Sequence, residues 1–184
     1  MEDKNRICPV ERAEALDVFI RKLVQSPSKM LKPYIKSGMT VLDVGCGPGF
    51  FSVEIAKMCD RTVNVIAADL QEGMLEKVRK KIVGTQLEEK IQLHKCQKDR
   101  LGVTDKVDFV LAFYMVHEVP DQDKFFSELK SLLNSGGKIL IVEPKFHVSE
   151  ESFKEMIGKL EKEGFEVEER PKIFFSRSVV VGMG

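Results

Sequence analysis

A glycine-rich run is the first segment of this chain whose residue types and spacing suggest chemistry. Residues 41–50 read VLDVGCGPGF, in which the apolar, strand-like run VLDV leads directly into a glycine-rich turn. Gly45, Gly47 and Gly49 lack Cβ atoms, so the backbone of this turn is open to a ligand. A strand, a glycine turn and a helix are a common arrangement for binding small anionic or nucleoside-like molecules.

The spacing of the glycines separates the possible ligand classes. A Walker A loop needs a Lys after its last glycine, and none follows here. A dinucleotide fingerprint G-x-G-x-x-G that begins at Gly45 would have its third glycine at position 50, which is Phe50. The pattern present is D-x-G-x-G-x-G, beginning at Asp43, which weighs against NAD and FAD.

Asp43 and the three glycines resemble motif I of the class I S-adenosylmethionine-dependent methyltransferases. In that family this turn holds the amino-acid end of the cofactor, and the helix start supplies a wall for it. The resemblance implies cofactor contacts from Asp43, Gly45, Cys46, Gly47, Gly49 and Phe50.

A second apolar run, residues 62–70, carries a carboxylate near its end, at Asp69. A carboxylate there can accept hydrogen bonds from both ribose hydroxyls of an adenosine ligand. The alternative is that Asp69 caps a helix opening at Gln71, and both roles can hold together. Leu70 and Met74 are then either walls for the adenine or ordinary core residues.

A third strand is predicted over residues 91–96, and the turn after it departs from the family pattern. The family commonly has an Asp beside the adenine amino group, where this chain has Gln97 followed by Lys98. Gln97 can accept one hydrogen bond through its carbonyl oxygen, and the backbone N–H of Lys98 can serve a ring nitrogen. We expect adenine recognition to survive.

The fourth predicted strand, residues 106–119, ends in a second cluster of chemically capable side chains. The cluster comprises Phe113, Tyr114, Met115, His117 and Glu118. In the resembling fold it faces the reactive end of the cofactor, with Phe113 as a further cofactor contact. His117 is the leading candidate for a general base, because its unperturbed pKa of about 6.5 lies near working pH. Tyr114, Glu118 and Glu143 are its rivals; the alternative for His117 is a structural histidine at a helix start or in the core.

The remaining elements predict an α/β fold. A helix is expected from Asp121 to a Gly136-Gly137 stop, a buried strand over 138–144, a helix from about Ser149 to Glu163, and strands within 165–170 and 174–183. Strands alternating with helices indicate a mostly parallel sheet with right-handed crossovers. The resemblance, which covers residues from about 38 to the end, implies the three-layer Rossmann-like methyltransferase fold with a seven-stranded sheet of order 3-2-1-4-5-7-6.

Length and charge predict one domain with no strong signal for a nucleic-acid partner. The 184 residues are most simply a single domain, 1–184, with an N-terminal helical lid over 1–37 and the Rossmann-like core over 38–184. The alternative for the helix predicted within the lid is that it only packs on the sheet and takes no part in a site. The residue types of the segment 8–12 do not indicate a role for it. Lys plus Arg and Asp plus Glu both number 29, so no overall basic charge attracts nucleic acid.

The sequence predicts a cytoplasmic protein without a membrane partner or a metal. It has no apolar run long enough to span a bilayer and no apolar signal segment. The spacing of its four cysteines fits no zinc pattern. Oligomeric state is left open.

These observations predict an S-adenosylmethionine-dependent methyltransferase with S-adenosylhomocysteine as product. The acceptor is expected to be a small molecule, because no sizeable inserted cap is present, and the methyl group to move by in-line displacement. No N-P-P-Y sequence follows the fourth strand and too few cysteines are freely placed to bind arsenic, so these two substrate classes are disfavoured. The alternatives are a sensor that binds the cofactor without turnover, a methyltransferase acting on a macromolecule and, more weakly, a nicotinamide oxidoreductase.

Overall fold

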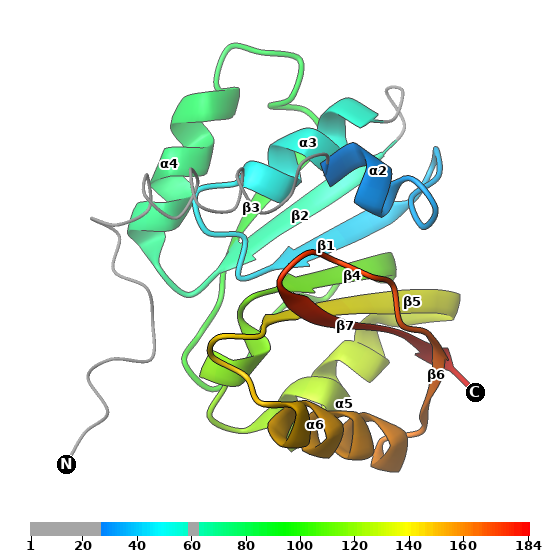
Figure 1. Cartoon of the computed structure of the whole chain (residues 1–184). Coiled ribbons are helices and arrows are strands. Elements are labelled where there is room, and N and C mark those ends of the chain that lie inside the picture. Colours follow the sequence, from blue (N-terminus) through cyan, green and yellow to red (C-terminus); the bar gives the residue numbers. More distant parts are fainter. Residues whose placement is uncertain (1–26, 59–62) are drawn as a thin grey trace, which may run out of the picture.

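A seven-stranded sheet lies between two layers of helices in the computed structural model, which describes residues 27–58 and 63–184 (Figure 1). Helices α2, α3 and α4 cover one face of the sheet, and α5 and α6 cover the other. The strands are β1 (Thr40–Val44), β2 (Asn64–Asp69), β3 (Ile91–Lys95), β4 (Val107–Phe113), β5 (Leu133–Pro144), β6 (Phe165–Glu169) and β7 (Ser176–Met183). The helices are α2 (Pro27–Leu31), α3 (Phe50–Met58), α4 (Glu72–Ile82), α5 (Gln122–Leu132) and α6 (Glu150–Lys162), with a short 3₁₀ turn η2 at Val116–Glu118.

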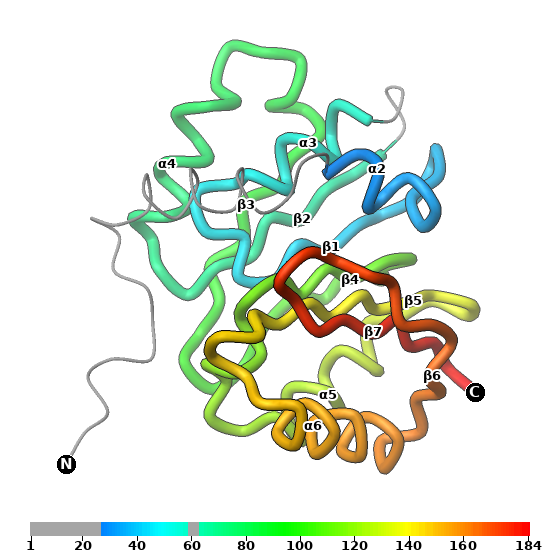
Figure 2. The backbone as a smooth tube through the Cα atoms, in the orientation of Figure 1, coloured from blue at the N-terminus to red at the C-terminus, as the bar shows by residue number. Residues whose placement is uncertain are grey.

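The strand order is β3-β2-β1-β4-β5-β7-β6, as the sequence predicted. The first five strands in this order pair in parallel, and β7 pairs antiparallel with both β5 and β6. The order reverses between β1 and β4, which lie side by side at the centre of the molecule (Figure 2). Ligands of open α/β sheets bind beyond the carboxyl ends of the strands at such a reversal, and this is where both chemically capable clusters lie.

Two hydrophobic cores, one on each face of the sheet, hold the central strands in place. Alternate residues of a strand point to opposite faces, so Val41 packs toward α3 and α4 whereas its neighbour Leu42 packs toward α5 and α6. Both side chains are fully buried. This double burial explains why β1 and β4 are continuous apolar runs in the sequence.

Two predicted boundaries were wrong. β4 ends at Phe113 rather than at residue 119, because Tyr114 has a positive φ of 58° that breaks the extended backbone, and η2 follows. α5 ends at Leu132, before the predicted Gly136-Gly137 stop, and β5 begins at once with Leu133 paired to Val107.

The expected lid helix and residues 8–12 fall mainly within 1–26, outside the described residues. In the part of the chain that is described, no helix is both long and apolar enough to cross a membrane.

Gly49 closes the glycine turn against α4. Its φ is +82°, and a Cβ built on it would lie 2.8 Å from the Val78 side chain. The missing side chain therefore lets α4 pack on the loop, which is a structural requirement additional to any contact with a ligand.

Replacing Gly49 with alanine is expected to lower the free energy of unfolding by about 2 kcal/mol, through the clash with Val78 and the unfavourable φ. Gly158→Ala is the matched control, because a Cβ at this position of α6 would meet nothing within 4 Å. Removing a glycine from a helix interior should instead raise the free energy of unfolding by roughly 0.5–1 kcal/mol. Urea unfolding measures both, and changes of the same sign would contradict the close packing at Gly49.

Candidate functional site

The glycine loop, residues 45–49, is anchored to the end of β2. The amide nitrogens of Gly45 and Cys46 both donate to the carbonyl of Ala68, at 2.8 and 3.0 Å. On its other side the loop meets the segment after β4, since a Cβ on Gly45 would lie 2.9 Å from Met115. The loop is thus held between the carboxyl ends of the second and fourth strands, which brings the two predicted clusters together.

Every backbone N–H of the glycine loop already has an acceptor within the protein. Besides Gly45 and Cys46, Gly47 donates to Asp69 Oδ2 at 2.9 Å, Gly49 donates to the carbonyl of Cys46 at 3.0 Å, and Pro48 has no N–H. A phosphate cradle needs such groups free. Within residues 45–49, the backbone groups that can still form hydrogen bonds to a ligand are carbonyl oxygens, which accept. The loop therefore suits a ligand that donates hydrogen bonds, such as an ammonium group.

Asp69 lies at the end of β2 and is buried. Its Oδ1 accepts from the Gln71 amide at 2.7 Å while its Oδ2 accepts from Gly47. Burial raises the pKa of Asp69, and the hydrogen bonds from Gln71 and Gly47 act in the opposite direction. Each oxygen of a carboxylate can accept two hydrogen bonds, so both can also accept from a ligand. α4 has Gln71 as its N-cap, so Asp69 supports the entry to that helix without being its cap.

Asp43 lies beneath the loop and is almost completely buried. The hydroxyl of Ser52 in α3 donates to Asp43 Oδ2 at 2.5 Å. Burial raises the pKa of Asp43 to about 7, although the hydrogen bond from Ser52 opposes this shift. The structure therefore gives Asp43 a role in joining β1 to α3 behind the loop.

The other predicted cofactor residues fall into two groups. Cys46, Phe50, Met74 and Phe113 are buried, whereas Leu70 is partly exposed and Gln97 and Lys98 are exposed. The Gln97 carbonyl oxygen that was expected to face the adenine accepts from Arg100 Nε at 2.9 Å and retains one further lone pair. Burial raises the pKa of the Cys46 thiol, which favours its neutral form.

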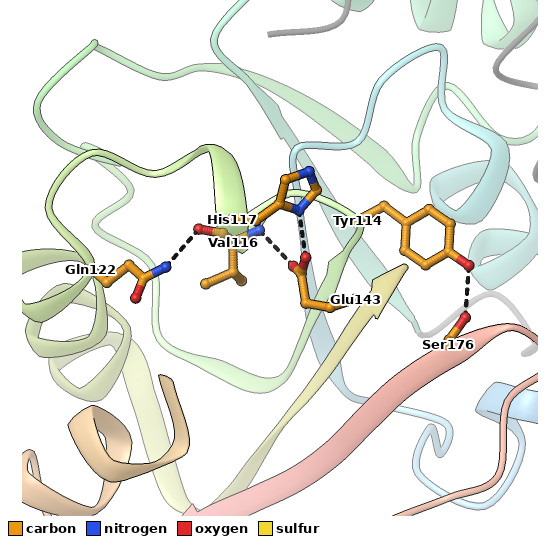
Figure 3. Close-up of polar contacts among 6 residues, drawn as sticks. All are labelled: Tyr114, Val116, His117, Gln122, Glu143 and Ser176. Atoms are coloured by element: carbon orange, nitrogen blue, oxygen red, sulfur yellow. Dashed lines mark hydrogen bonds and ion pairs between the residues drawn. The ribbon is translucent and has the colours of Figure 1, made fainter. Parts of the chain in front are cut away.

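His117 and Glu143 form a hydrogen-bonded pair at the carboxyl ends of β4 and β5 (Figure 3). His117 Nδ1 bonds Glu143 Oε2, and the other carboxylate oxygen accepts from the Val116 amide at 2.9 Å. Glu143 is 1% exposed and the His117 side chain 26% exposed. A carboxylate accepts only, so this bond places the imidazole proton on Nδ1 and leaves Nε2, which points away from Glu143 in Figure 3, as a proton acceptor.

The pKa of His117 is raised. Burial by itself lowers it, but the hydrogen bond to Glu143 and the charge of that carboxylate outweigh the effect of burial. A carboxylate behind an imidazole both orients the ring and stabilises its protonated form. The sequence named Glu143 only as a rival base, and the structure makes it the partner of His117.

The hydroxyl of Tyr114 is engaged by another side chain of the protein. Its hydroxyl lies 2.7 Å from Ser176 Oγ, and burial raises its pKa (Figure 3). The ring stacks on Phe113 with centroids 4.3 Å apart and meets Phe146 edge-on. Ser176 was missed by the sequence analysis, and nothing in its local pattern could have indicated it.

An unbroken series of ring contacts runs from the glycine loop to His117. Successive members have centroids 4.3 to 6.4 Å apart, in the order Phe50, Phe51, Phe113, Tyr114, Phe146, His147 and His117. Across residues 27–58 and 63–184 there is no group of three or more His, Cys, Asp or Glu side chains that could hold a metal ion. The candidate site therefore combines a series of aromatic rings with one imidazole–carboxylate pair.

Comparisons with known proteins place this arrangement among methyltransferases. A family model described as "Methyltransferase domain" matches residues 35–174. The demethylmenaquinone methyltransferase of Lactobacillus johnsonii is 34% identical over 110 residues, 59% of this chain and 45% of that protein. The ubiquinone/menaquinone biosynthesis C-methyltransferase UbiE of Haemophilus ducreyi is 28% identical over 110 residues, 59% of this chain and 42% of that protein. The match thus spans less than half the length of these curated relatives.

Solved structures resemble the chain over nearly its whole length. A SAM-dependent methyltransferase from Aquifex aeolicus superposes with a TM-score of 0.83 at 27% identity, covering 95% of this chain and 98% of that one. A second, from Clostridium acetobutylicum, has a TM-score of 0.75 at 13% identity over 95% of this chain and 98% of that one, and shows the shared fold.

Asp43→Asn is expected to stabilise the fold, and by an amount that grows with pH. The folded pKa of about 7 lies above the ordinary value of 3.8, so ionised Asp43 destabilises the folded state progressively as pH rises between these values. The gain in free energy of unfolding should be about 2 kcal/mol larger at about pH 8 than at about pH 5. Urea unfolding at both values measures it, with Glu54→Gln, which removes a partly exposed carboxylate from α3, as the control. A gain independent of pH would contradict the raised pKa.

Proposed function

Because the chain belongs to the Methyltransferase domain family, whose cofactor is S-adenosylmethionine, we propose that it methylates a small molecule with a planar ring and that His117 accepts the proton. The observation that carries the proposal is the His117–Glu143 pair, which joins the segment after β4 to the end of β5. β4 pairs with β1, the strand that leads into the glycine loop, and β1 pairs with β2, which ends at Asp69. This pairing of strands supports a proton acceptor on the same side of the sheet as the residues that we propose hold the cofactor.

The residues present fit S-adenosylmethionine. Asp69 has accepting capacity left for ribose hydroxyls, and the glycine loop offers oxygens rather than N–H groups, which suits the ammonium of the methionine end. Phe50 and Phe113 would line that end, and Leu70 and Met74 the adenine, with Gln97 and Lys98 at its edge. When bound, the sulfonium supplies an activated methyl group and a neutral leaving group for an in-line displacement.

The aromatic series supports a flat acceptor. Phe113, Tyr114 and Phe146 contact one another in turn, and the series continues through His147 to His117. Aromatic rings favour stacked or edge-on contacts with a planar ligand. The similar proteins from Lactobacillus johnsonii and Haemophilus ducreyi are named for quinone precursors, which are planar rings. Holding such a ring in line and excluding water can contribute about 7–11 kcal/mol to lowering the barrier.

The His117–Glu143 pair explains how a ring hydroxyl or ring carbon of the acceptor would lose its proton. Glu143 holds the Nδ1 proton, so Nε2 of the neutral imidazole can take the proton from the acceptor. Glu143 then stabilises the imidazolium that results. The raised pKa of His117 makes it a stronger base, but also requires a higher pH before it is neutral.

Methyl transfer is distinguished from cofactor sensing by product formation. With purified full chain, S-adenosylmethionine and a panel of quinols, phenols, amines and thiols, we expect S-adenosylhomocysteine to form with one of the quinols or phenols. Tight cofactor binding without product from any class would instead support the sensor.

Asp69→Ala is expected to weaken S-adenosylhomocysteine binding at least tenfold, because hydrogen bonds to a charged group contribute roughly 1.5–3 kcal/mol each. Isothermal titration calorimetry measures the dissociation constant. Glu72→Ala removes an exposed carboxylate from the first turn of α4 and should leave it unchanged. An unaltered constant in Asp69→Ala would remove the ribose assignment.

His117→Gln should reduce kcat by roughly 10²–10⁴-fold with little effect on cofactor affinity. In the unmodified chain kcat should rise with pH around a midpoint above 6.5, because His117 must be neutral and its pKa is raised. Glu143→Gln should move this midpoint to lower pH, since it removes the charge that raises the pKa. His147→Gln, the neighbouring imidazole outside the pair, is the control; loss of turnover there but not in His117→Gln would reassign the base.

A further inference from the structure

Three phenylalanines are exposed together on two loops at the edge of the candidate site. Phe146, in the loop after β5, is 55% exposed; Phe174 and Phe175, in the loop before β7, are 66% and 57% exposed. A hydrogen bond from the Lys145 amide to the Phe175 carbonyl, at 3.0 Å, ties the loops together. In the described part of the chain, only Val83 and Met183 are comparably exposed large apolar residues, and both lie elsewhere in the sequence.

Lysines accompany these rings. An open hollow of about 550 Å³ is lined by Lys145, Lys172, Ile173, Phe174 and Phe175, and this described lining includes two cationic and no acidic side chains. The chain as a whole has no net charge, so the positive charge is local to this surface. We call the surface formed by Lys145, Phe146, Lys172, Phe174 and Phe175 the aromatic–basic patch.

The backbone holds Phe175 in its exposed position. Its φ is +52°, a region where a bulky side chain is a genuine outlier. The flanking hydrogen bonds, from Lys145 to Phe175 and from Ser176 to Ile173 at 3.0 and 3.1 Å, maintain this conformation. Strained conformations persist where the surrounding structure determines them, and they cluster at binding sites. A bulky ring displayed to solvent at such a position is therefore a fixed feature of the loop.

We propose that the aromatic–basic patch docks onto the surface of a lipid bilayer containing anionic headgroups. Aromatic rings enter the boundary between headgroups and acyl chains, and lysines beside them reach anionic lipids. A second copy of the chain fits less well, because a two-fold interface would bring two lysine-bearing patches against each other. The proposal departs from the prediction of no membrane partner. That prediction was based only on the absence of long apolar segments, which docking through exposed side chains does not require.

The patch borders the proposed acceptor site. Phe146 contacts Tyr114 edge-on, and the Tyr114 hydroxyl bonds Ser176, the residue after Phe175. Docking would place the mouth of the site at the lipid surface. Binding to lipid does not require methyl transfer, so it is tested without cofactor or acceptor, and its failure leaves the proposed function standing.

Co-sedimentation of the full chain with two kinds of vesicle tests the proposal. We expect binding to phosphatidylcholine vesicles containing phosphatidylserine and much weaker binding to phosphatidylcholine alone. Lys145→Gln and Lys172→Gln should each weaken binding about fivefold, and Phe174→Ser should weaken it at least as much. Lys80→Gln and Val83→Ser, which alter an exposed lysine and an exposed apolar residue near the end of α4, should bind as the unmodified chain does.

Phe175→Gly separates docking from stability. Glycine adopts positive φ without strain, so the melting temperature should stay the same or rise while vesicle binding weakens. Binding that persists in all the patch variants, or no binding of the unmodified chain to anionic vesicles, would overturn the proposal. So would a concentration-dependent dimer, seen by light scattering, that Phe174→Ser abolishes, because the patch would then be a protein interface.

Discussion

The hydrogen bonds that tie the glycine loop to the end of β2 are the constraint on which the rest of the site depends. Ala68 and Asp69 accept from three successive amides, those of Gly45, Cys46 and Gly47. Because these N–H groups already donate hydrogen bonds within the protein, they are not available to a phosphate, and the loop can offer only oxygens to a ligand. This attachment also fixes Gly45 against Met115, and thereby sets where the chain leaves β4 toward His117. The ligand class that we propose and the position of the proposed base both depend on this one local arrangement.

The sequence predicted the features that short segments encode. The central strands are recognisable because both faces are buried, and Asp69 because a carboxylate at the end of an apolar run is unusual. The His117–Glu143 pair joins residues 26 positions apart, and Tyr114–Ser176 residues 62 apart. Such pairs depend on strand register, which no local pattern specifies. The end of β4 was misjudged for a related reason: Tyr114 has a positive φ that its residue type disfavours, and only the surrounding tertiary contacts explain it.

Three energetically unfavourable features lie toward the carboxyl end of the central strands. Tyr114 and Phe175 have positive φ without being glycine, and Asp43 is a buried carboxyl group whose ionised form is disfavoured. Each costs stability that an asparagine or a glycine would recover. Their concentration at one end of the sheet is characteristic of a functional region, since elsewhere in the described chain the non-glycine backbone keeps negative φ.

The proposed acceptor site and the proposed lipid surface share a structural element. Ser176 begins β7, and its hydroxyl bonds Tyr114, whose ring stacks on Phe113 on the cofactor side. Phe175, immediately before it, belongs to the aromatic–basic patch. A displacement of the patch on docking would therefore be transmitted to Tyr114 through one residue and one hydrogen bond. Because Tyr114 stacks on Phe113 and meets Phe146 edge-on, such a displacement would change the width of the proposed acceptor site. The Tyr114–Ser176 hydrogen bond is thus a direct link between the proposed acceptor site and the surface that we propose contacts lipid.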